Sequence, residues 1–183
     1  MRKRLSRTVF LAGAAVIAAG LPGTAHATPE ATAGGAVTAD EKGHYLFCTG
    51  RSGDRSIVVD LYENSLYGAV AGVVVEGPDG EYGGGATPSR LFDNGSVSVE
   101  VPVEAHGAGG GPAGTAVIQG TYAATGEPER VHEVTREPSW VVVARGTRQQ
   151  LGSALTITVL DTTTPLSCES SFAFDLKVTR TPV

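Results

Sequence analysis

Several kinds of residue and pattern are scarce in this chain, and each scarcity excludes a class of structure. Only 6% of the 183 residues are aromatic, so the core has to be built mainly from aliphatic side chains. No apolar run reaches the length of about 20 residues that a membrane-spanning helix needs. After residue 27 the sequence shows no convincing amphipathic helix pattern, which leaves strands as the expected regular structure.

Basic residues are also scarce, with 14 lysines and arginines against 19 aspartates and glutamates. All 19 acidic residues follow Ala27, whereas four of the 14 basic residues precede it, so a chain that begins at Thr28 carries a net charge of −9. Such a charge repels nucleic acid and anionic membrane surfaces. We therefore predict no nucleic-acid partner and no membrane span, which leaves an unknown protein, glycan or small molecule as the partner.

The first 27 residues have the three parts of a secretory signal peptide. Residues 2–4 are basic, the uncharged apolar segment 9–21 follows, and Ala25-His26-Ala27 offers small residues to a signal peptidase. We predict cleavage after Ala27 and a secreted, extracellular protein. The abundance of alanine, glycine, valine and arginine is typical of a high-GC bacterial genome.

Cysteine is nearly absent, since Cys48 and Cys168 are the only two. An exported chain folds in an oxidising compartment, where two cysteines permit one intramolecular pairing. Neither cysteine has a second cysteine or a histidine at metal-ligand spacing. We therefore predict a Cys48–Cys168 disulfide that joins the first strand to the last, either within one sheet or across two packed layers.

Composition divides the chain into three parts. Segment 28–43 is rich in alanine, threonine and glycine and has almost no large apolar residues, so burial cannot offset the entropy cost of ordering it. We predict a signal peptide at 1–27, a disordered lead-in at 28–43 and a single all-β domain at 44–183.

Alternation of apolar and polar residues with a period of two dominates segment 44–183. In segment 96–104 the four valines share one face, and in segment 170–179 the residues at 172, 174, 176 and 178 share one face; we predict that both faces point inward. Segment 69–75 is apolar on both faces, which predicts a central strand covered on both sides. Further strands are predicted at 45–49, 57–62, 115–123, 131–135, 140–144 and 155–159. These nine or so strands predict an antiparallel β-sandwich, with a closed β-barrel as the alternative.

The sequence contains no coherent catalytic pattern. Nucleophilic catalysis needs a nucleophile beside a general base. Ser52 lies in the turn sequence 50–54, which matches neither a nucleophile elbow nor a trypsin-like serine loop and is ordinarily a hairpin turn. His106 lies in a glycine-rich loop that would hold a general base poorly. We therefore predict no catalytic residues and expect that the protein is not an enzyme.

Metal-ligating residue types are present without metal-site spacing. Four glutamates surround His132 in the sequence: Glu127, Glu129, Glu133 and Glu137. No second histidine follows at the interval of a helical zinc motif. Four carboxylates near predicted turns suit calcium in type but not in spacing: Asp79, Glu81, Asp93 and Asp161. Glu100 and Glu104 share an outward face but lack the aromatic platforms of a glycosidase. The sequence therefore predicts no metal and no cofactor.

The leading hypothesis is a secreted, non-catalytic β-domain that binds a partner or acts at the cell envelope. The alternatives are a secreted hydrolase whose site is assembled from distant loops and a structural surface protein. A cleft with two convergent carboxylates, or Ser52 beside a histidine, would favour the enzyme. A flat apolar patch on one sheet would favour the binding protein.

Overall fold

The computed structural model describes residues 35–107 and 110–183, so the predicted signal peptide and residues 28–34 of the predicted lead-in lie outside it. Over the described ranges the regular structure is antiparallel strand throughout, as predicted. The ten strands are β1 (Val37–Ser52), β2 (Arg55–Asn64), β3 (Gly68–Gly77), β4 (Gly80–Ala86), β5 (Phe92–Asp93), β6 (Ser96–Ala105), β7 (Pro112–Ala124), β8 (Glu129–Arg136), β9 (Trp140–Val159) and β10 (Thr162–Pro182). The described residues form no helix with the length and apolarity that a membrane crossing requires.

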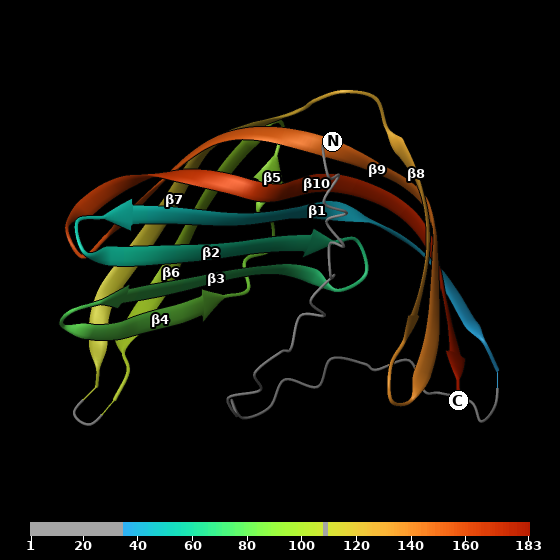
Figure 1. Ribbon diagram of the computed structural model, residues 1–183, viewed down its shortest axis with the longest axis horizontal. Helices are drawn as coiled ribbons and strands as arrows, with labels where there is room; N and C mark the ends of the chain where they lie inside the picture. Colours follow the sequence, from blue (N-terminus) through green and yellow to red (C-terminus); the bar gives the residue numbers. More distant parts are fainter. Residues whose placement is uncertain (1–34, 108–109) are drawn as a thin grey trace, which may run out of the picture. The chain divides into compact units, whose positions relative to one another are not determined.

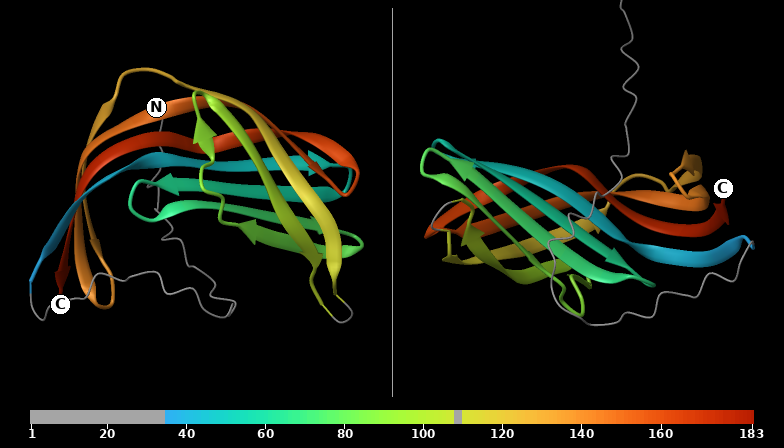
Figure 2. Two further views of the ribbon diagram at one scale, coloured as in Figure 1. Left: turned by 180° about the vertical axis from the view of Figure 1, so that it is seen from behind. Right: turned by 90° about the horizontal axis from the view of Figure 1, so that it is seen from below.

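The strands form one continuous sheet that folds over on itself into two layers, in the manner of a sandwich (Figure 1). Hydrogen bonds connect them in the order β10-β1-β2-β3-β4-β6-β7-β9-β8, while β5 pairs with β6 and β9 also pairs with β10. Strands β1 to β4 lie in front in Figure 1, and the view from behind in Figure 2 brings β6 and β7 to the front. The side chains between the layers are therefore shielded from water on both sides.

The core between the layers is aliphatic, as the scarcity of aromatic residues predicts. The largest fully buried side chains include Leu46, Leu61, Ile118, Ile157, Val59 and Val73. In β6 all four valines are buried, whereas Glu100 and Glu104 are exposed, which confirms the predicted faces of this strand. Each such buried valine stabilises the fold by about 1.5–3 kcal/mol relative to an exposed one.

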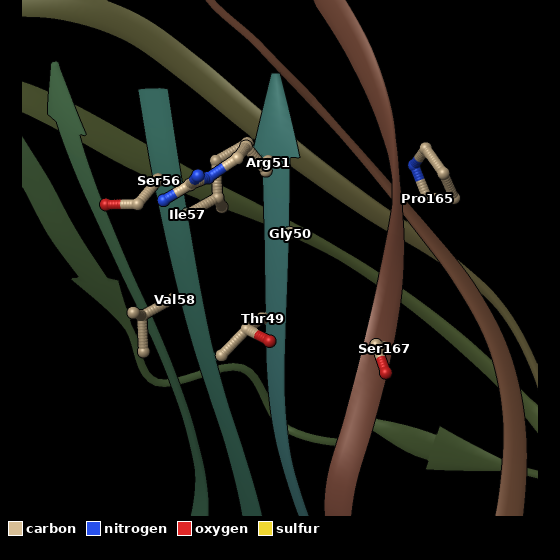
Figure 3. A pocket seen from close by; sticks show the side chains of 8 residues that line it. All are labelled: Thr49, Gly50, Arg51, Ser56, Ile57, Val58, Pro165 and Ser167. Carbon is tan, nitrogen blue, oxygen red and sulfur yellow. The ribbon is translucent and has the colours of Figure 1, made fainter. Parts of the chain in front are cut away.

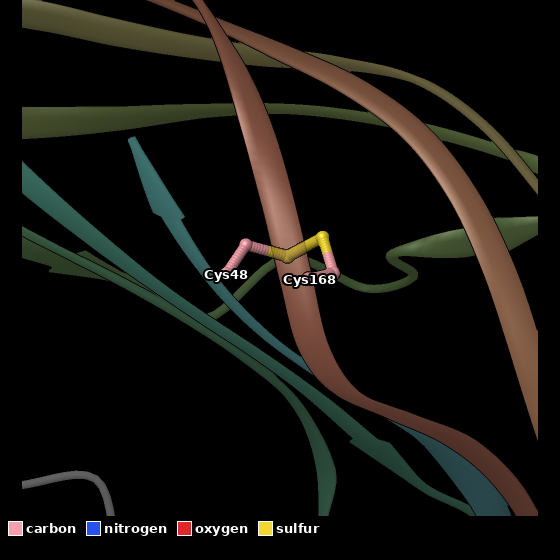
Figure 4. Close-up of a disulfide and its surroundings, with 2 residues drawn as sticks. All are labelled: Cys48 and Cys168. Atoms are coloured by element: carbon pink, nitrogen blue, oxygen red, sulfur yellow. A yellow bond between two sulfur atoms is a disulfide. The ribbon is translucent and has the colours of Figure 1, made fainter. Parts of the chain in front are cut away.

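Cys48 and Cys168 form the predicted disulfide, and they do so within one sheet (Figure 4). The two residues are directly opposite one another in the pairing of β1 with β10. Cys48 is fully buried and Cys168 packs against the core, so both sulfur atoms face inward. The bond joins residues 120 apart in the sequence. A loop of this length gives about 5 kcal/mol of stabilisation in the chain-entropy model.

The inward face predicted for segment 170–179 is wrong, because β10 contains one extra residue. Glu169 stands between the partners of Cys48 and Phe47 and has no partner of its own in β1. A bulge of this kind reverses which side chains face the core beyond it. Ser171 is opposite Leu46 and is completely buried. Phe172, Phe174, Leu176 and Val178 therefore lie on the face of the sheet opposite Ser171 and outside the main core, although Phe174 and Val178 are themselves buried.

Strand β1 begins at Val37, so residues 37–43 are strand rather than disordered lead-in. These residues pair with β10 along their whole length. Glu41, whose exposed fraction is 5%, accepts a hydrogen bond of 2.7 Å from Arg180 and one of 2.9 Å from the side-chain amide of Asn64. Residues 37–43 have too few apolar side chains to offset the entropy cost of their ordering by burial alone. The hydrogen bonds of the strand ladder and these charge-assisted bonds offset that cost instead.

The predicted strands correspond to eight of the ten in the structure, because segments 140–144 and 155–159 are the two ends of β9. Strands β4 and β5 have no predicted counterpart. Strand β4 has the sequence Gly-Glu-Tyr-Gly-Gly-Gly-Ala, which lacks alternation, and β5 has only two residues. Both depend on backbone pairing with neighbours rather than on a pattern of their own.

Candidate binding face

The outer surface of β3 is uncovered within the described part of the chain. Segment 69–75 predicted a strand covered on both sides, but the exposed fractions of Val70 and Val74 are 46% and 37%. The intervening Ala71 and Val73 are buried in the core. Within the described residues, the prediction that segment 69–75 is covered on both faces is wrong. Its outward apolar side chains are accessible to solvent or to a partner.

These valines belong to a larger surface, formed by the outward side chains of β10, β1, β2, β3 and β4. The pairing register arranges the side chains in rows that cross the strands. The first row contains Thr49, Val58, Val74 and Gly83. The second row contains Ser170, Phe47, Asp60, Gly72 and Gly85. The third row contains Phe172, Tyr45, Tyr62 and Val70. We call these three rows the outer face. Its apolar and aromatic character is typical of the centre of an interaction surface.

Two opposed glycines leave a bare strip of backbone between Val70 and Val74. Gly72 on β3 is directly opposite Gly85 on β4, and we call this pair the glycine strip. A Cβ atom added at Gly72 would approach no atom closer than 3.9 Å, so no described side chain fills this space. Residues two apart on a strand are separated by about 6.6 Å, so the flanking valines leave room for one extended side chain between them.

Asp60 closes one end of the glycine strip. It is directly opposite Gly72 on β3 and Phe47 on β1. Its neighbours remove water from the carboxylate, which raises the pKa of Asp60 above the ordinary value, and no charged group of the described residues opposes this shift. A carboxylate in such surroundings gains stability from a cation or a hydrogen-bond donor on a ligand.

Aromatic side chains pack against one another in and next to the third row of the outer face. The rings of Tyr45 and Phe172 lie 5.4 Å apart between centroids, and Tyr62 stacks on Phe174 at 6.2 Å. The guanidinium of Arg148 lies over the Phe172 ring, 4.4 Å from its centroid. Burial, and secondly the negative charge of Asp60, raises the pKa of the Tyr45 hydroxyl.

A shallow depression of about 430 Å³ adjoins the first row of the outer face (Figure 3). Its lining includes Thr49, Val58 and Ser167, and Arg51 is its one ionisable lining residue. A second depression, of about 280 Å³, is lined by Asp161 among others. Neither lining contains a pair of carboxylates or a histidine, so neither has the composition that the hydrolase hypothesis requires.

The residues considered for nucleophilic catalysis are not brought together among the described residues. Ser52 ends β1 at a turn where Gly53 has a φ of 58°, and no hydrogen bond joins it to a histidine of the described chain. The imidazole Nδ1 of His106 lies 3.3 Å from a carboxylate oxygen of Glu81, and both side chains are about half exposed. The backbone N–H of His106 also donates to the carbonyl of Glu81. This pair fixes a loop to β4.

The charged cluster around His132 separates onto the two faces of β8. Glu133 shares a face with Arg148 and lies 3.4 Å from its guanidinium. His132 is on the other face, directly opposite Arg145. Strand alternation therefore places the side chains of His132 and Glu133 on opposite faces of β8, whereas the ligands of one metal ion must converge on the same point.

Two of the four turn carboxylates considered for calcium form ion pairs with arginines. Asp79 forms an ion pair with Arg55, and Asp93 forms one with Arg90 at 3.0 Å. Over residues 35–107 and 110–183 no three histidine, cysteine, aspartate or glutamate side chains gather closely enough to hold a metal ion.

His44 lies at one end of the core, where sequence analysis assigned it no role. Its ring stacks on Phe92 at 4.8 Å and meets the edge of Tyr122 at 5.4 Å. The cross-strand neighbour Glu63 accepts hydrogen bonds from the backbone N–H groups of Leu91 and Phe92. Burial lowers the pKa of the His44 imidazole. These contacts close the core and hold β5 in place.

Sequence reasoning missed the outer face because the bulge at Glu169 moves the phenylalanines of β10 from the predicted inner side to the outer side. One sequence feature could have indicated this surface. Segment 69–75 is apolar on both faces, and in the structure the apolar residues on its outward face are exposed. No family model, no curated protein and no solved structure matches the chain. Function is therefore argued from the outer face itself.

Proposed function

We propose that the protein is a secreted, non-catalytic binding protein that engages a partner protein through the outer face. The observation that carries this proposal is the exposure of Val70 and Val74 beside the unpaired carboxylate of Asp60. Soluble monomers rarely leave a contiguous apolar patch without a binding role. The Cys48–Cys168 disulfide suits the oxidising compartment that the N-terminal sequence predicts.

The chemistry of the glycine strip favours a lysine or arginine side chain of the partner. Its aliphatic stem fits between Val70 and Val74, and its charged head reaches Asp60. Phe47 is directly opposite Asp60 and Tyr45 is two residues along the same face of β1, so aromatic rings adjoin the place where the cation would bind. A net charge of −9 on the exported form also attracts a basic partner over longer distances.

The two alternative functions predict different behaviour. A hydrolase requires a nucleophile or paired carboxylates in a cleft, and neither depression in the described residues has that composition. A structural surface protein is compatible with an exposed sheet but gives no reason for a preference for basic ligands. A test of ligand preference therefore separates the proposed function from both.

Selection from a displayed library of random peptides, with the exported protein immobilised, tests the proposed function. We expect enrichment of peptides that carry arginine or lysine next to an aromatic or aliphatic residue. Asp60→Asn removes the charge without changing the shape of the side chain. We expect this variant to bind a selected peptide at least tenfold more weakly in fluorescence anisotropy, a loss of about 1.4 kcal/mol.

Ser98→Val is the matched control, because it changes an outward position of β6 on the opposite layer. Its affinity for the selected peptide should equal that of the wild type. A selection that enriches no basic peptide, or peptides that bind Asp60→Asn as tightly as the wild type, would refute the proposed function.

A further inference from the structure

A four-stranded extension of the sheet carries most of the basic residues that follow the predicted signal peptide. It consists of β8 with residues 140–148 of β9, 174–182 of β10 and 37–42 of β1, which bend away from the two layers in Figure 1. Seven of the ten basic residues after Ala27 lie in it: Lys42, Arg130, Arg136, Arg145, Arg148, Lys177 and Arg180. An acidic chain thus has a local concentration of positive charge.

Strand alternation sorts these charges onto one face of the extension. His132 on β8 is directly opposite Arg145 on β9, and Arg145 is directly opposite Lys177 on β10. Opposed residues of antiparallel strands point to the same side of the sheet. We call this side the basic face, and its cationic or titratable basic side chains are Lys42, Arg130, His132, Arg136, Arg145 and Lys177.

The basic face is only partly neutralised. Asp175 lies 2.8 Å from Lys42, and Asp40 lies 3.9 Å from Lys177. No carboxylate of the described residues forms an ion pair with Arg145. Its direct neighbour across the strands is Lys177, and like charges in that arrangement destabilise a sheet. A ligand that supplies negative charge would convert this repulsion into attraction.

Two arginines of β8 extend the same unneutralised surface. Arg130 and Arg136 alternate with His132 and Val134 on the basic face, and neither arginine forms an ion pair with a carboxylate of the described residues. Val134 has an exposed fraction of 60%, which shows that nothing in the described ranges covers this part of β8. The face is therefore open along the whole strand.

We propose that the basic face binds a linear polymer of phosphate groups. Arginine binds phosphate oxygens in a bidentate manner, and arginine is the commonest basic residue here. Adjacent strands are about 4.8 Å apart, so Arg145 and Lys177 present positive charges at a short interval, and Arg130, Arg136 and Lys42 extend the charge along a path that a polymer follows and a single small anion does not. The other described residues of this face are valines, threonines and the two aspartates, none of which has an aromatic ring on which a nucleic-acid base could stack.

Fluorescence anisotropy with labelled inorganic polyphosphate and the full exported protein tests this proposal. The wild type should bind, and its affinity should fall steeply as salt is raised, because counterions are released on binding. The double variant Arg130→Glu/Arg145→Glu should lose at least tenfold in affinity. The control Arg51→Glu/Arg90→Glu changes the net charge equally outside the extension and should lose less than twofold.

The melting temperature of Arg145→Glu separates lost binding from lost folding. It should stay unchanged or rise, since a glutamate there faces Lys177. The proposal is overturned if the wild type does not bind polyphosphate or if the two double variants lose affinity equally. It is also overturned if phosphatidylglycerol vesicles or single-stranded DNA of equal charge bind more tightly than polyphosphate. None of these results bears on the outer face.

Discussion

At the scale of single residues, Asp60 and His44 show the same physical effect at two different places. Removal of water raises the pKa of the Asp60 carboxyl and lowers the pKa of the His44 imidazole, because it makes the charged form of each group less favourable than it is in water. For Asp60, which is open to a partner on the outer face, a bound cation would relieve the cost of ionisation. For His44, which is stacked on Phe92, the negative charge of the neighbouring Glu63 offsets only part of this cost, and the remainder affects folding.

We expect acidification from about pH 7.5 to 5 to lower the free energy of unfolding, in part through His44. Its pKa in the fold lies below the ordinary value of 6.5, so its contribution is fully present above 6.5 and is lost as the pH falls through the lower value of the folded state. Urea unfolding of the wild type and of His44→Phe at both pH values measures this. The variant should show a smaller loss; an equal loss would mean that other groups account for the whole effect.

At the scale of elements, the sequence correctly predicts a strand and its faces where the strand's own residues alternate regularly. The prediction of the faces fails where the pairing with a neighbouring strand decides which side chains are buried. Strand β6 has four buried valines in regular alternation, so its existence and both its faces follow from the sequence. In β10 the alternation is equally clear, but one extra residue, Glu169, directly after the disulfide-bonded Cys168 reverses the faces beyond it. No local pattern reveals that bulge, and the aromatic packing in and next to the third row of the outer face depends on it.

Contacts between residues distant in sequence limit prediction in the same way at β1 and β4. The first residues of β1 are ordered by Arg180, which is 139 positions away from its partner Glu41. Strand β4 is held by pairing with β3 and contributes Gly85 to the glycine strip. The candidate site therefore combines a predictable strand pattern in β2 and β3 with features that only the assembled sheet shows.

Val99→Asp should strongly destabilise or unfold the domain, because it places an unpaired charge on the inner face of β6, where Val99 is 6% exposed. Glu100→Ala, one residue away on the exposed face, should change stability by less than about 0.5 kcal/mol. Urea denaturation of both variants measures the contrast. Similar effects of the two substitutions would contradict the assignment of the faces.

Replacing both Cys48 and Cys168 with alanine should lower the free energy of unfolding by several kcal/mol, since the bond closes a loop spanning 120 residues. Chemical denaturation of the double variant measures the loss. Non-reducing peptide mapping of the native protein should recover the linked pair of cysteine peptides. Two titratable thiols in the native protein would show that β1 and β10 are held by pairing alone.

At the scale of the whole molecule, charge and apolar surface are distributed unevenly over the described residues. The outer face combines apolar side chains with Asp60, while the four-stranded extension concentrates arginines on its basic face. The two surfaces share strands β1 and β10 but lie on opposite faces of the sheet and carry opposite charge. The two proposals together assign a basic protein partner to the outer face and a phosphate polymer to the basic face.

The affinity of Gly72→Val for a selected basic peptide tests the central claim most directly. Gly72 has an ordinary strand conformation with open space above it, so a valine there should raise stability by about 0.5–1 kcal/mol while filling the glycine strip. We predict that this variant melts at the same or a higher temperature than the wild type and binds the peptide at least tenfold more weakly. A variant that binds the peptide as tightly as the wild type would show that the outer face is not the binding surface.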